Sequence, residues 1–213
     1  MSSAALVLAS TSRYRASLLE RLEVPFEVLA PDYDEEACRG LFGSLPPDGF
    51  ALHLARGKAA SLRDARPDAW ILAADQIGVL ERDGALRLLR KPGSVEAALA
   101  QLQAMSGRSH ELITAVVLAP PSGGAPLEAV DRQRLTMRRF GPDEARAYVE
   151  RHRPLDCAGG IRIEDAGIKL CERIEGSDYT GIIGLPLLAV ARLLRTAGFL
   201  PGDVDPAEGP EAQ

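Results

Sequence analysis

Residues 6–22 read LVLASTSRYRASLLERL, a stretch that predicts a strand, a turn and a helix in immediate succession. Residues 6–9 form a short apolar run of the kind found in buried strands. Ser10, Thr11 and Ser12 mark the turn, and the leucines of residues 15–22 then fall on one helical face. A strand that runs directly into a helix is typical of the start of an α/β fold.

The rest of the chain continues this alternation. Strands are expected at residues 26–30, 70–74, 109–119, 128–139 and 169–174, with a hairpin of residues 77–80 and 86–89, and helices at residues 50–62, 95–105, 142–153 and 187–197. No internal repeat is visible, so residues 1–200 are predicted to form one mixed α/β domain with two lobes around a cleft. Residues 201–213 are acidic and poor in large apolar groups, which predicts a disordered tail.

Composition restricts the class of partner. The net charge of -5 gives no general positive field for nucleic acid or an anionic membrane, so an anionic ligand needs a local cluster of cations. Three widely spaced cysteines without a CxxC pair favour a reducing compartment. No segment has the roughly 18 apolar residues of a membrane span or the basic start of a signal peptide. We therefore expect a cytoplasmic protein with a small ligand.

Lysine is rare in this chain, since Lys58, Lys91 and Lys169 are the three lysines among 25 basic residues. A compact ammonium fits a tight phosphate site that a planar guanidinium does not. Lys58 and Lys91 lie in segments on either side of Asp75, which favours a shared site. Chance retention explains any one of these lysines equally well when it is considered alone.

The turn at residues 10–15, STSRYR, has the features of an anion site. Hydroxyls and free backbone N–H groups lie together at a predicted helix start, and Arg15 adds a bidentate phosphate donor. The alternative is a helix N-cap with surface arginines. For the turn taken alone, that alternative is the better interpretation.

Asp75 follows the predicted strand 70–74, at a strand end of the kind where open α/β sheets place their ligands. A carboxylate there can hold a divalent metal or accept a proton from water, whereas Asp75 alone is better explained as a turn aspartate. Asp34, Glu35 and Glu36 either join Asp75 around a metal or form a solvated acidic loop.

The remaining candidates are glycines, histidines and a cysteine. Glycines recur in residues 156–160, 175–176 and 184–187, where they permit either close approach to a ligand or tight turns. The histidines show no ligand spacing and are expected to be structural or exposed; they are His53, His110 and His152. Cys157 has no paired histidine, so we expect it to pack rather than act as a nucleophile.

A series of short motifs occurs in order between residues 5 and 199, namely LASTSRYRASLLERL, PDYDEE, LARGKA, AADQ, RKP, LQAMSGRSHELIT, PLDCAGG and EGSDYTGIIGLPL. Together they resemble the Maf family of nucleotide pyrophosphatases. Several motifs in register are far more specific than any one of them. The resemblance implies a Maf/ITPase-like mixed sheet with flanking helices, two lobes around a central cleft, and a homodimer.

The same resemblance implies hydrolysis of a nucleoside triphosphate between its α and β phosphates, with Mg²⁺ or Mn²⁺ as the cofactor. Asp75 falls on the family's proposed general base, and Glu35 falls on an acidic position near the metal, so these two are the expected metal ligands. The residues that fall on phosphate-binding positions are Ser12, Arg15, Lys58 and Lys91. Phosphoryl transfer needs positioned water and neutralised oxygens, and these residue types supply both.

Three positions indicate a branch of the family. Tyr14, Gln76 and Glu164 resemble the 7-methyl-GTP branch, the YceF-like proteins, in which Trp is usual at the place of Tyr14. An aromatic face attracts the positive charge that N7-methylation gives guanine, and a carboxylate accepts the guanine N1–H and N2–H donors. Arg13 and Arg90 replace a usual proline and glycine, which leaves the shape of both phosphate turns open.

Two alternative functions follow from the same resemblance. A dTTP/UTP pyrophosphatase is disfavoured by Gln76 and Glu164. A nucleotide-binding regulator of septum formation, an activity associated with Maf relatives, needs no hydrolysis. Asp75→Asn separates this regulator from an enzyme, because a regulator keeps its cellular effect in the variant.

Overall fold

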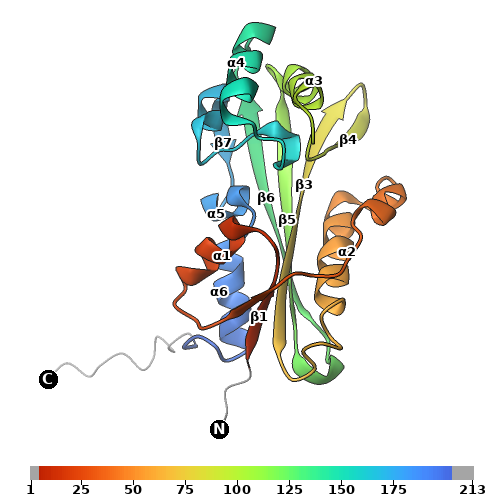
Figure 1. Ribbon diagram of the computed structural model, residues 1–213, viewed down its shortest axis with the longest axis vertical. Coiled ribbons are helices and arrows are strands. Elements are labelled where there is room, and N and C mark those ends of the chain that lie inside the picture. The colour runs from red at the N-terminus through yellow and green to blue at the C-terminus, as the bar shows by residue number, and fades with distance from the viewer. Residues whose placement is uncertain (1–4, 203–213) are drawn as a thin grey trace, which may run out of the picture.

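The computed structural model describes residues 5–202 and contains a seven-stranded mixed sheet with helices on both faces (Figure 1). The strands are β1 (Leu6–Ala9), β2 (Glu27–Leu29), β3 (Trp70–Arg82), β4 (Ala85–Leu89), β5 (Ser109–Ala119), β6 (Leu127–Met137) and β7 (Cys171–Glu175). The strand order is β2-β1-β3-β5-β6-β7, and β4 pairs with β3. The expected mixed α/β sheet is therefore confirmed, while the predicted tail from residue 203 onward lies outside the described residues.

The helices are α1 (Arg13–Glu20), α2 (Pro47–Ala60), α3 (Val95–Met105), α4 (Pro142–His152), α5 (Tyr179–Ile183) and α6 (Leu187–Thr196). Four short 3₁₀ helices are also present, η1 (Glu36–Leu41), η2 (Pro121–Gly123), η3 (Ala158–Gly160) and η4 (Ala166–Leu170). Within residues 5–202, no helix has the length and apolar character that crossing a membrane requires.

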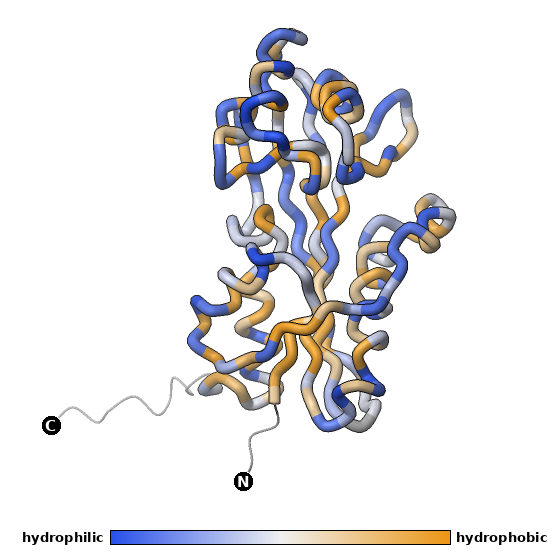
Figure 2. Tube along the Cα trace, in the orientation of Figure 1, coloured by the Kyte–Doolittle hydropathy of each residue, from blue (hydrophilic) through white to orange (hydrophobic). Residues whose placement is uncertain are grey.

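The lower lobe is built on the alternation of side chains along its strands. Val7, Ile71 and Ala73 point to one face of the sheet, where α2 covers them in one hydrophobic cluster. Leu8 and Leu72 point to the other face, where α1 and α6 cover them in a second cluster. Figure 2 shows the resulting apolar centre where β1 and β3 cross the lower lobe. The run of buried residues in β1 is thus explained by helices on both faces.

The upper lobe shares its strands with the lower one. β3 has 13 residues, and β5 and β6 have 11 each, so all three extend upward out of the lower lobe (Figure 1). There α3 and α4 pack on them in a third cluster that includes Leu80, Leu102, Met137 and Val149. The sequence predicts two lobes around a cleft, and in the structure these lobes are built on the two ends of one sheet.

The prediction that a strand ends just before Asp75 is wrong. β3 continues through Asp75 to Arg82, because antiparallel pairing with β5 supports it over residues 71–79. The strand that ends here is β1, whose parallel pairing with β3 stops at the pair Ala9 and Ala73. Asp75 therefore lies beyond the carboxyl end of its neighbour, and β1 determines the position of the site.

Smaller differences have local causes. The first helix begins at Arg13, two residues before its predicted start, because Ser12 caps it. The second begins at Pro47, a residue suited to a first helical turn. Lys169 lies in η4, so the last strand begins at Cys171. The segment predicted as a loop after residue 174 contains α5, which is too short for helical periodicity to identify.

Candidate active site

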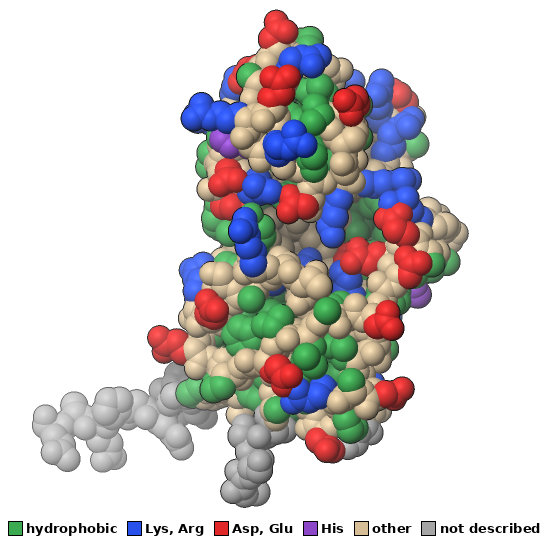
Figure 3. Space-filling view, viewed as in Figure 1, with side chains coloured by type: hydrophobic (Ala, Val, Ile, Leu, Met, Phe, Trp, Pro, Cys, Tyr) green, Lys and Arg blue, Asp and Glu red, His purple; other side chains and the backbone are tan. Residues whose placement is uncertain are grey.

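A cleft between the lobes contains two adjoining chambers, and Figure 3 shows the molecule hollowed at this level, with charged side chains around the rim. The large chamber has a volume of about 440 Å³ and is lined by residues 11–15, 156–158, 161, 163, 164 and 182–184 together with side chains of the sheet. The small chamber, of about 100 Å³, contains Asp75 and Glu35. Gln76, Lys91 and Ala158 line both chambers and mark their junction.

A gap at one side of β3 joins the chambers. β1 pairs with β3 as far as Ala73, and β4 pairs with it from Gly78 onward, so residues 74–77 have no strand partner on that side among the described residues. Asp75 and Gln76 lie within this gap. Because successive side chains in a strand point to opposite faces, Asp75 faces α2 and Gln76 faces the large chamber.

A cluster of charges lies at the small chamber, with Lys58 and Asp75 buried and Glu35 half-buried. The Lys58 ammonium, from α2, donates a hydrogen bond to the Asp75 carboxylate and lies 2.7 Å from Oε1 of Glu35. Lys58 and Asp75 are only 5% and 4% exposed. Removing Lys58 would leave the buried Asp75 carboxylate without its ion-pair partner, which is costly, whereas Lys58 without Asp75 would still contact Glu35. The sequence prediction that these three residues share a site is consistent with this geometry.

The charges of this cluster alter one another's pKa values. Burial raises the pKa of Asp75 above its ordinary value, although the positive charges of Lys58 and Arg15 oppose that rise. Burial also acts to raise the pKa of Glu35, but Lys58, Lys91 and Arg15 outweigh it and hold that pKa below its ordinary value. Four of the site residues predicted from sequence thus shift these two pKa values: Lys58 and Arg15 act on both carboxylates, Lys91 acts on Glu35, and Glu35 acts on Asp75.

The first turn of α1 carries an arginine, Arg15, which is held by a residue from the C-terminal part of the chain. Ser12 caps α1 by accepting a hydrogen bond from the Arg15 backbone N–H at 3.4 Å, and Ser10 accepts one from the Ser12 N–H at 3.0 Å. Arg15 Nε donates to the Gly184 carbonyl at 2.8 Å. Ser12 is therefore a helix cap, as the alternative interpretation expects, while Arg15 lines the large chamber and its role in an anion site stays a prediction.

The side-chain amide of Gln76 is held in one orientation, because its nitrogen faces two backbone carbonyls and a hydroxyl. Its Nε2 donates to the carbonyls of Gly181 and Ile182 at 2.7 and 3.1 Å and to Thr114 Oγ1 at 3.0 Å. Thr114 Oγ1 in turn donates to the Gly181 carbonyl at 3.1 Å. Because backbone carbonyls cannot donate, the nitrogen must point toward them, and the amide oxygen is left to accept a hydrogen bond from a ligand.

A buried network holds the α5 turn that carries these carbonyls. Asp178 accepts hydrogen bonds from the Thr180 N–H at 2.9 Å, from the Thr180 hydroxyl at 2.5 Å and from the Leu188 N–H at 2.7 Å. Gln133 Nε2 donates to the Asp178 carbonyl at 2.9 Å. Sequence reasoning noted the glycines of this segment but missed the network, because no spacing rule identifies a backbone carbonyl as a site group.

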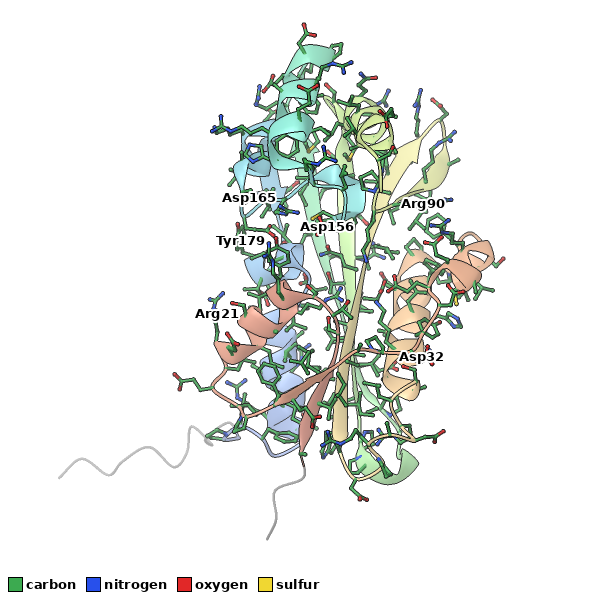
Figure 4. The ribbon with its side chains drawn as sticks, viewed as in Figure 1. Arg21, Asp32, Arg90, Asp156, Asp165 and Tyr179 are labelled. Atoms are coloured by element: carbon green, nitrogen blue, oxygen red, sulfur yellow. The ribbon has the colours of Figure 1, made fainter. Side chains whose placement is uncertain are left out.

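Tyr14 lies at the mouth of the large chamber under two guanidinium groups. Those of Arg13 and Arg162 lie 4.9 and 5.9 Å from the centre of its ring. Arg162 comes from the upper lobe and contacts Asp156 at 2.7 Å, and Figure 4 labels Asp156 directly above the cleft. The ring of Tyr14 is therefore already a surface on which cations stack. Arg162 was not among the predicted site residues.

Three other candidate residues from the sequence line the cleft, and a fourth does not. Glu164 lines the large chamber from the segment that follows η3, and Lys91 is exposed at the junction of the chambers. Cys157 lines the large chamber, where burial raises the pKa of its thiol to about 11, so it stays protonated at neutral pH, as expected of a packing residue. Asp34 instead accepts hydrogen bonds from the Glu36 and Ala37 N–H groups.

The carboxylates fit a divalent cation only together with a ligand. Among residues 5–202, no group of three or more His, Cys, Asp or Glu side chains is arranged to hold a metal by itself. Glu35 and Asp75 do converge on one ammonium, that of Lys58. Mg²⁺ is commonly bound by one or two carboxylates plus substrate phosphates, so two converging carboxylates match that requirement.

Comparison with known proteins identifies the family. Residues 5–197 match the family described as Maf-like protein. The chain belongs to the Maf family. This Maf chain is 41% identical over 189 residues to a 7-methyl-GTP pyrophosphatase from Syntrophotalea carbinolica, an alignment that covers 89% of this chain and 92% of the relative.

Two further relatives carry the same name. A 7-methyl-GTP pyrophosphatase from Xanthomonas campestris pv. campestris is 43% identical over 194 residues, covering 91% of the Maf chain and 96% of the relative. One from Aromatoleum aromaticum is 42% identical over 196 residues, covering 92% and 96%. The likeness therefore extends over both lobes and both chambers.

Proposed function

We propose that this Maf protein hydrolyses 7-methyl-GTP to 7-methyl-GMP and diphosphate and so clears a modified nucleotide. The observation that carries the proposal is the junction of the two chambers at Gln76 and Lys91. Through this gap one ligand can reach recognition residues on one face of β3 and the carboxylates of Asp75 and Glu35 on the other. The names of the relatives support the choice of nucleotide.

The large chamber suits the base. The Tyr14 ring, over which guanidinium groups already lie, stacks on a positively charged 7-methylguanine. Glu164 accepts hydrogen bonds from the N1–H and N2–H donors of guanine, and the amide oxygen of Gln76 accepts one from the ligand. Neutral pyrimidines offer neither the charge nor this pair of donors. The recognition residues therefore favour a methylated purine.

The cations suit the triphosphate. Ser12, Arg15 and Lys91 line the large chamber, and Lys58 lies beyond the junction, in contact with Asp75 of the small chamber. Arg15 binds phosphate oxygens with a guanidinium that Gly184 holds in place, while the two lysines act as point charges. Because phosphoryl transfer depends on positioning and on neutralising oxygen charge, this arrangement supplies most of the catalysis.

Asp75 accepts a proton from the water that attacks the α phosphorus. The new P–O bond forms as the bond between that phosphorus and the oxygen bridging to the β phosphate breaks, and diphosphate leaves with the bonding electrons. The raised pKa of Asp75 makes its carboxylate a better proton acceptor than a solvated aspartate. Lys58, in contact with this carboxylate, favours its ionised form and orients it.

We also propose that Mg²⁺ or Mn²⁺ binds to Glu35, Asp75 and the substrate phosphates. When bound, the cation neutralises phosphate oxygens during the displacement. Chelation with EDTA should abolish diphosphate release, and either cation should restore it; undiminished turnover after chelation would exclude a metal requirement.

The resemblance to Maf proteins supports a cytoplasmic homodimer, and light scattering on the purified chain tests the dimer.

A diphosphate-release assay over several nucleotides tests the proposed function. The purified chain with Mg²⁺ or Mn²⁺ should release diphosphate from 7-methyl-GTP well above its rates on GTP, UTP and dTTP. A preference for UTP or dTTP would assign the chain to the pyrimidine branch of its family. Absence of hydrolysis with every nucleotide would favour a binding regulator over an enzyme.

A further inference from the structure

His110 lies in the large chamber and takes no part in the function proposed so far. It is on β5, four residues before Thr114, and it pairs with Leu135 across β6. Because side chains two and four residues apart in a strand share a face, His110 projects from the same face as Thr114, the partner of Gln76. Its imidazole therefore lines the large chamber from the same face of the sheet as Gln76 and Thr114.

The imidazole is buried without a partner. His110 is 3% exposed, and its Nδ1 makes no hydrogen bond within residues 5–202. The side chains around it on this face are apolar, since Leu112, Leu135 and Ile163 line the same chamber and pack in one hydrophobic cluster. They offer neither donor nor acceptor. Buried polar atoms are rarely left in this state, and each such atom calls for an explanation.

The imidazole is also uncharged at neutral pH. Burial lowers the pKa of His110 to about 4, so the ring carries one N–H donor and one acceptor. The ionisable groups lining the same chamber are Arg13, Tyr14 and Arg15 on α1, and Lys91, Asp156, Cys157 and Glu164 on loop segments. An imidazolium among these cations would repel a cationic base, whereas a neutral ring would not.

We infer that His110 is a specificity-determining residue, which donates a hydrogen bond from its uncharged imidazole to the carbonyl oxygen O6 of the guanine base. This inference rests on the proposed function. O6 adjoins the N1–H that Glu164 would bind, so the two residues together would read the three adjacent groups of guanine. The unpartnered imidazole then gains its hydrogen bond when the base enters, and the apolar walls exclude water from that bond.

Binding of 7-methyl-GMP to His110→Leu, measured by calorimetry, tests the inference. Leucine keeps an apolar side chain in the chamber but removes the donor, so the Kd should rise about 5-fold to 100-fold, the range for a lost hydrogen bond in a closed site. His110→Gln retains a neutral donor and should recover part of this affinity. The Kd for inorganic tripolyphosphate, which has no base, should not change in either variant.

The stability of the free protein separates recognition from a structural role. Since the imidazole has no partner in the described structure, His110→Leu should unfold at the same temperature as the wild type or higher, while it binds the base more weakly. Glu111→Gln is the matched control, because the adjacent Glu111 pairs with Arg132 outside the chambers and should leave base affinity unchanged.

Two results would overturn the inference. Unchanged affinity for 7-methyl-GMP in His110→Leu would do so, and so would a loss of affinity that appears equally for tripolyphosphate or only with a lowered unfolding temperature. The proposed function fails separately, when the wild type does not hydrolyse 7-methyl-GTP preferentially. Because binding of 7-methyl-GMP needs no hydrolysis, the assignment of His110 stays testable in that case.

Discussion

Asp75 and Gln76 are neighbours on β3, yet they belong to two different environments. On the Asp75 face, buried charges contact one another, and Lys58 is shared between two carboxylates. On the Gln76 face, the amide nitrogen of Gln76 is held by the protein, and its amide oxygen is left for a ligand. His110, on the same face, has no hydrogen-bond partner at Nδ1 in the described structure.

This difference separates reaction from recognition. Groups that act on phosphates must hold their charges in position before substrate arrives, and they stabilise one another's ionised forms. Groups that read a base must have unused hydrogen-bonding capacity, because discrimination depends on polar groups that the wrong ligand leaves unpaired. Changes on the Asp75 face should therefore alter turnover, and changes on the Gln76 face should alter selectivity or affinity.

The largest effect is expected on the Asp75 face. Asp75→Asn removes the proton acceptor and should lower kcat about 100-fold to 10,000-fold with a modest change in KM. Steady-state kinetics on 7-methyl-GTP measure it. Asp143→Asn is the control, because Asp143 is exposed in the first turn of α4 and lines neither chamber, and its kcat should stay near that of the wild type. Equal turnover in Asp75→Asn would remove the assigned role.

On the other face, His110 should make stability depend on pH. An unfolded histidine binds a proton near pH 6.5, whereas the folded imidazole does so only near its pKa of about 4. The unfolded state therefore binds more protons between these values, and stability should fall by up to about 3 kcal/mol as pH drops from 6.5 to 4. Urea unfolding at several pH values should show this loss in the wild type and a smaller one in His110→Leu.

The next largest effect is expected at Asp178, whose hydrogen bonds hold the α5 turn beside Gln76. Asp178→Ala removes three accepted hydrogen bonds in the α5 turn and should cost about 1–3 kcal/mol of stability. It should also raise KM, because the Gly181 and Gly184 carbonyls then no longer hold Gln76 and Arg15 in place. Asp178→Asn keeps an acceptor and should lose less. If Asp178→Ala is destabilised but its KM is unaltered, the α5 turn does not contribute to substrate recognition.

Selectivity for the methylated base should depend on the ring of Tyr14. Tyr14→Leu should reduce kcat/KM for 7-methyl-GTP relative to GTP by about 0.5–2 kcal/mol, or roughly 2-fold to 30-fold, because only the methylated base is cationic. Tyr14→Phe keeps the ring and should retain most of the preference. A parallel loss on both nucleotides would show that the ring stacks without reading charge.

The smallest effect is expected outside both chambers. Arg56 contacts Glu128 at 2.5 Å on the surface, and Arg56→Gln should change stability by no more than about 1 kcal/mol. The variant should leave both kcat and nucleotide preference unchanged in the same assays. A clear change in kcat or in nucleotide preference would show that residues outside the two chambers also affect activity.

Much of the fold followed from the sequence because its signals are local. The apolar run of β1, the capped start of α1 and the hydrophobic spacing of α3 each depend on residues within a few positions of one another. The extension of β3 past Asp75 did not follow, since it depends on pairing with β5 some 40 residues away. α5 was missed because five residues are too few for a periodic pattern.

The candidate site was only partly predictable in the same sense. Motif resemblance selected residues such as Ser12, Lys58 and Glu164, and all of its selections line the chambers or contact residues that do. It offered no reason to select Arg162 or Thr114, and His110 was expected to be structural or exposed. A residue type and a spacing carry no information on which polar atom is left without a partner after folding.

The sequence by itself determined the chemistry, that is, which hydroxyls, cations and carboxylates exist and which short elements carry them. The tertiary structure alone decided that β1 stops at Ala9, that the resulting gap beside β3 joins two faces of the sheet, and that Asp75 and Gln76 serve different chambers. The physical reason is that side-chain alternation is a property of one strand, whereas an open strand edge depends on where its neighbours end.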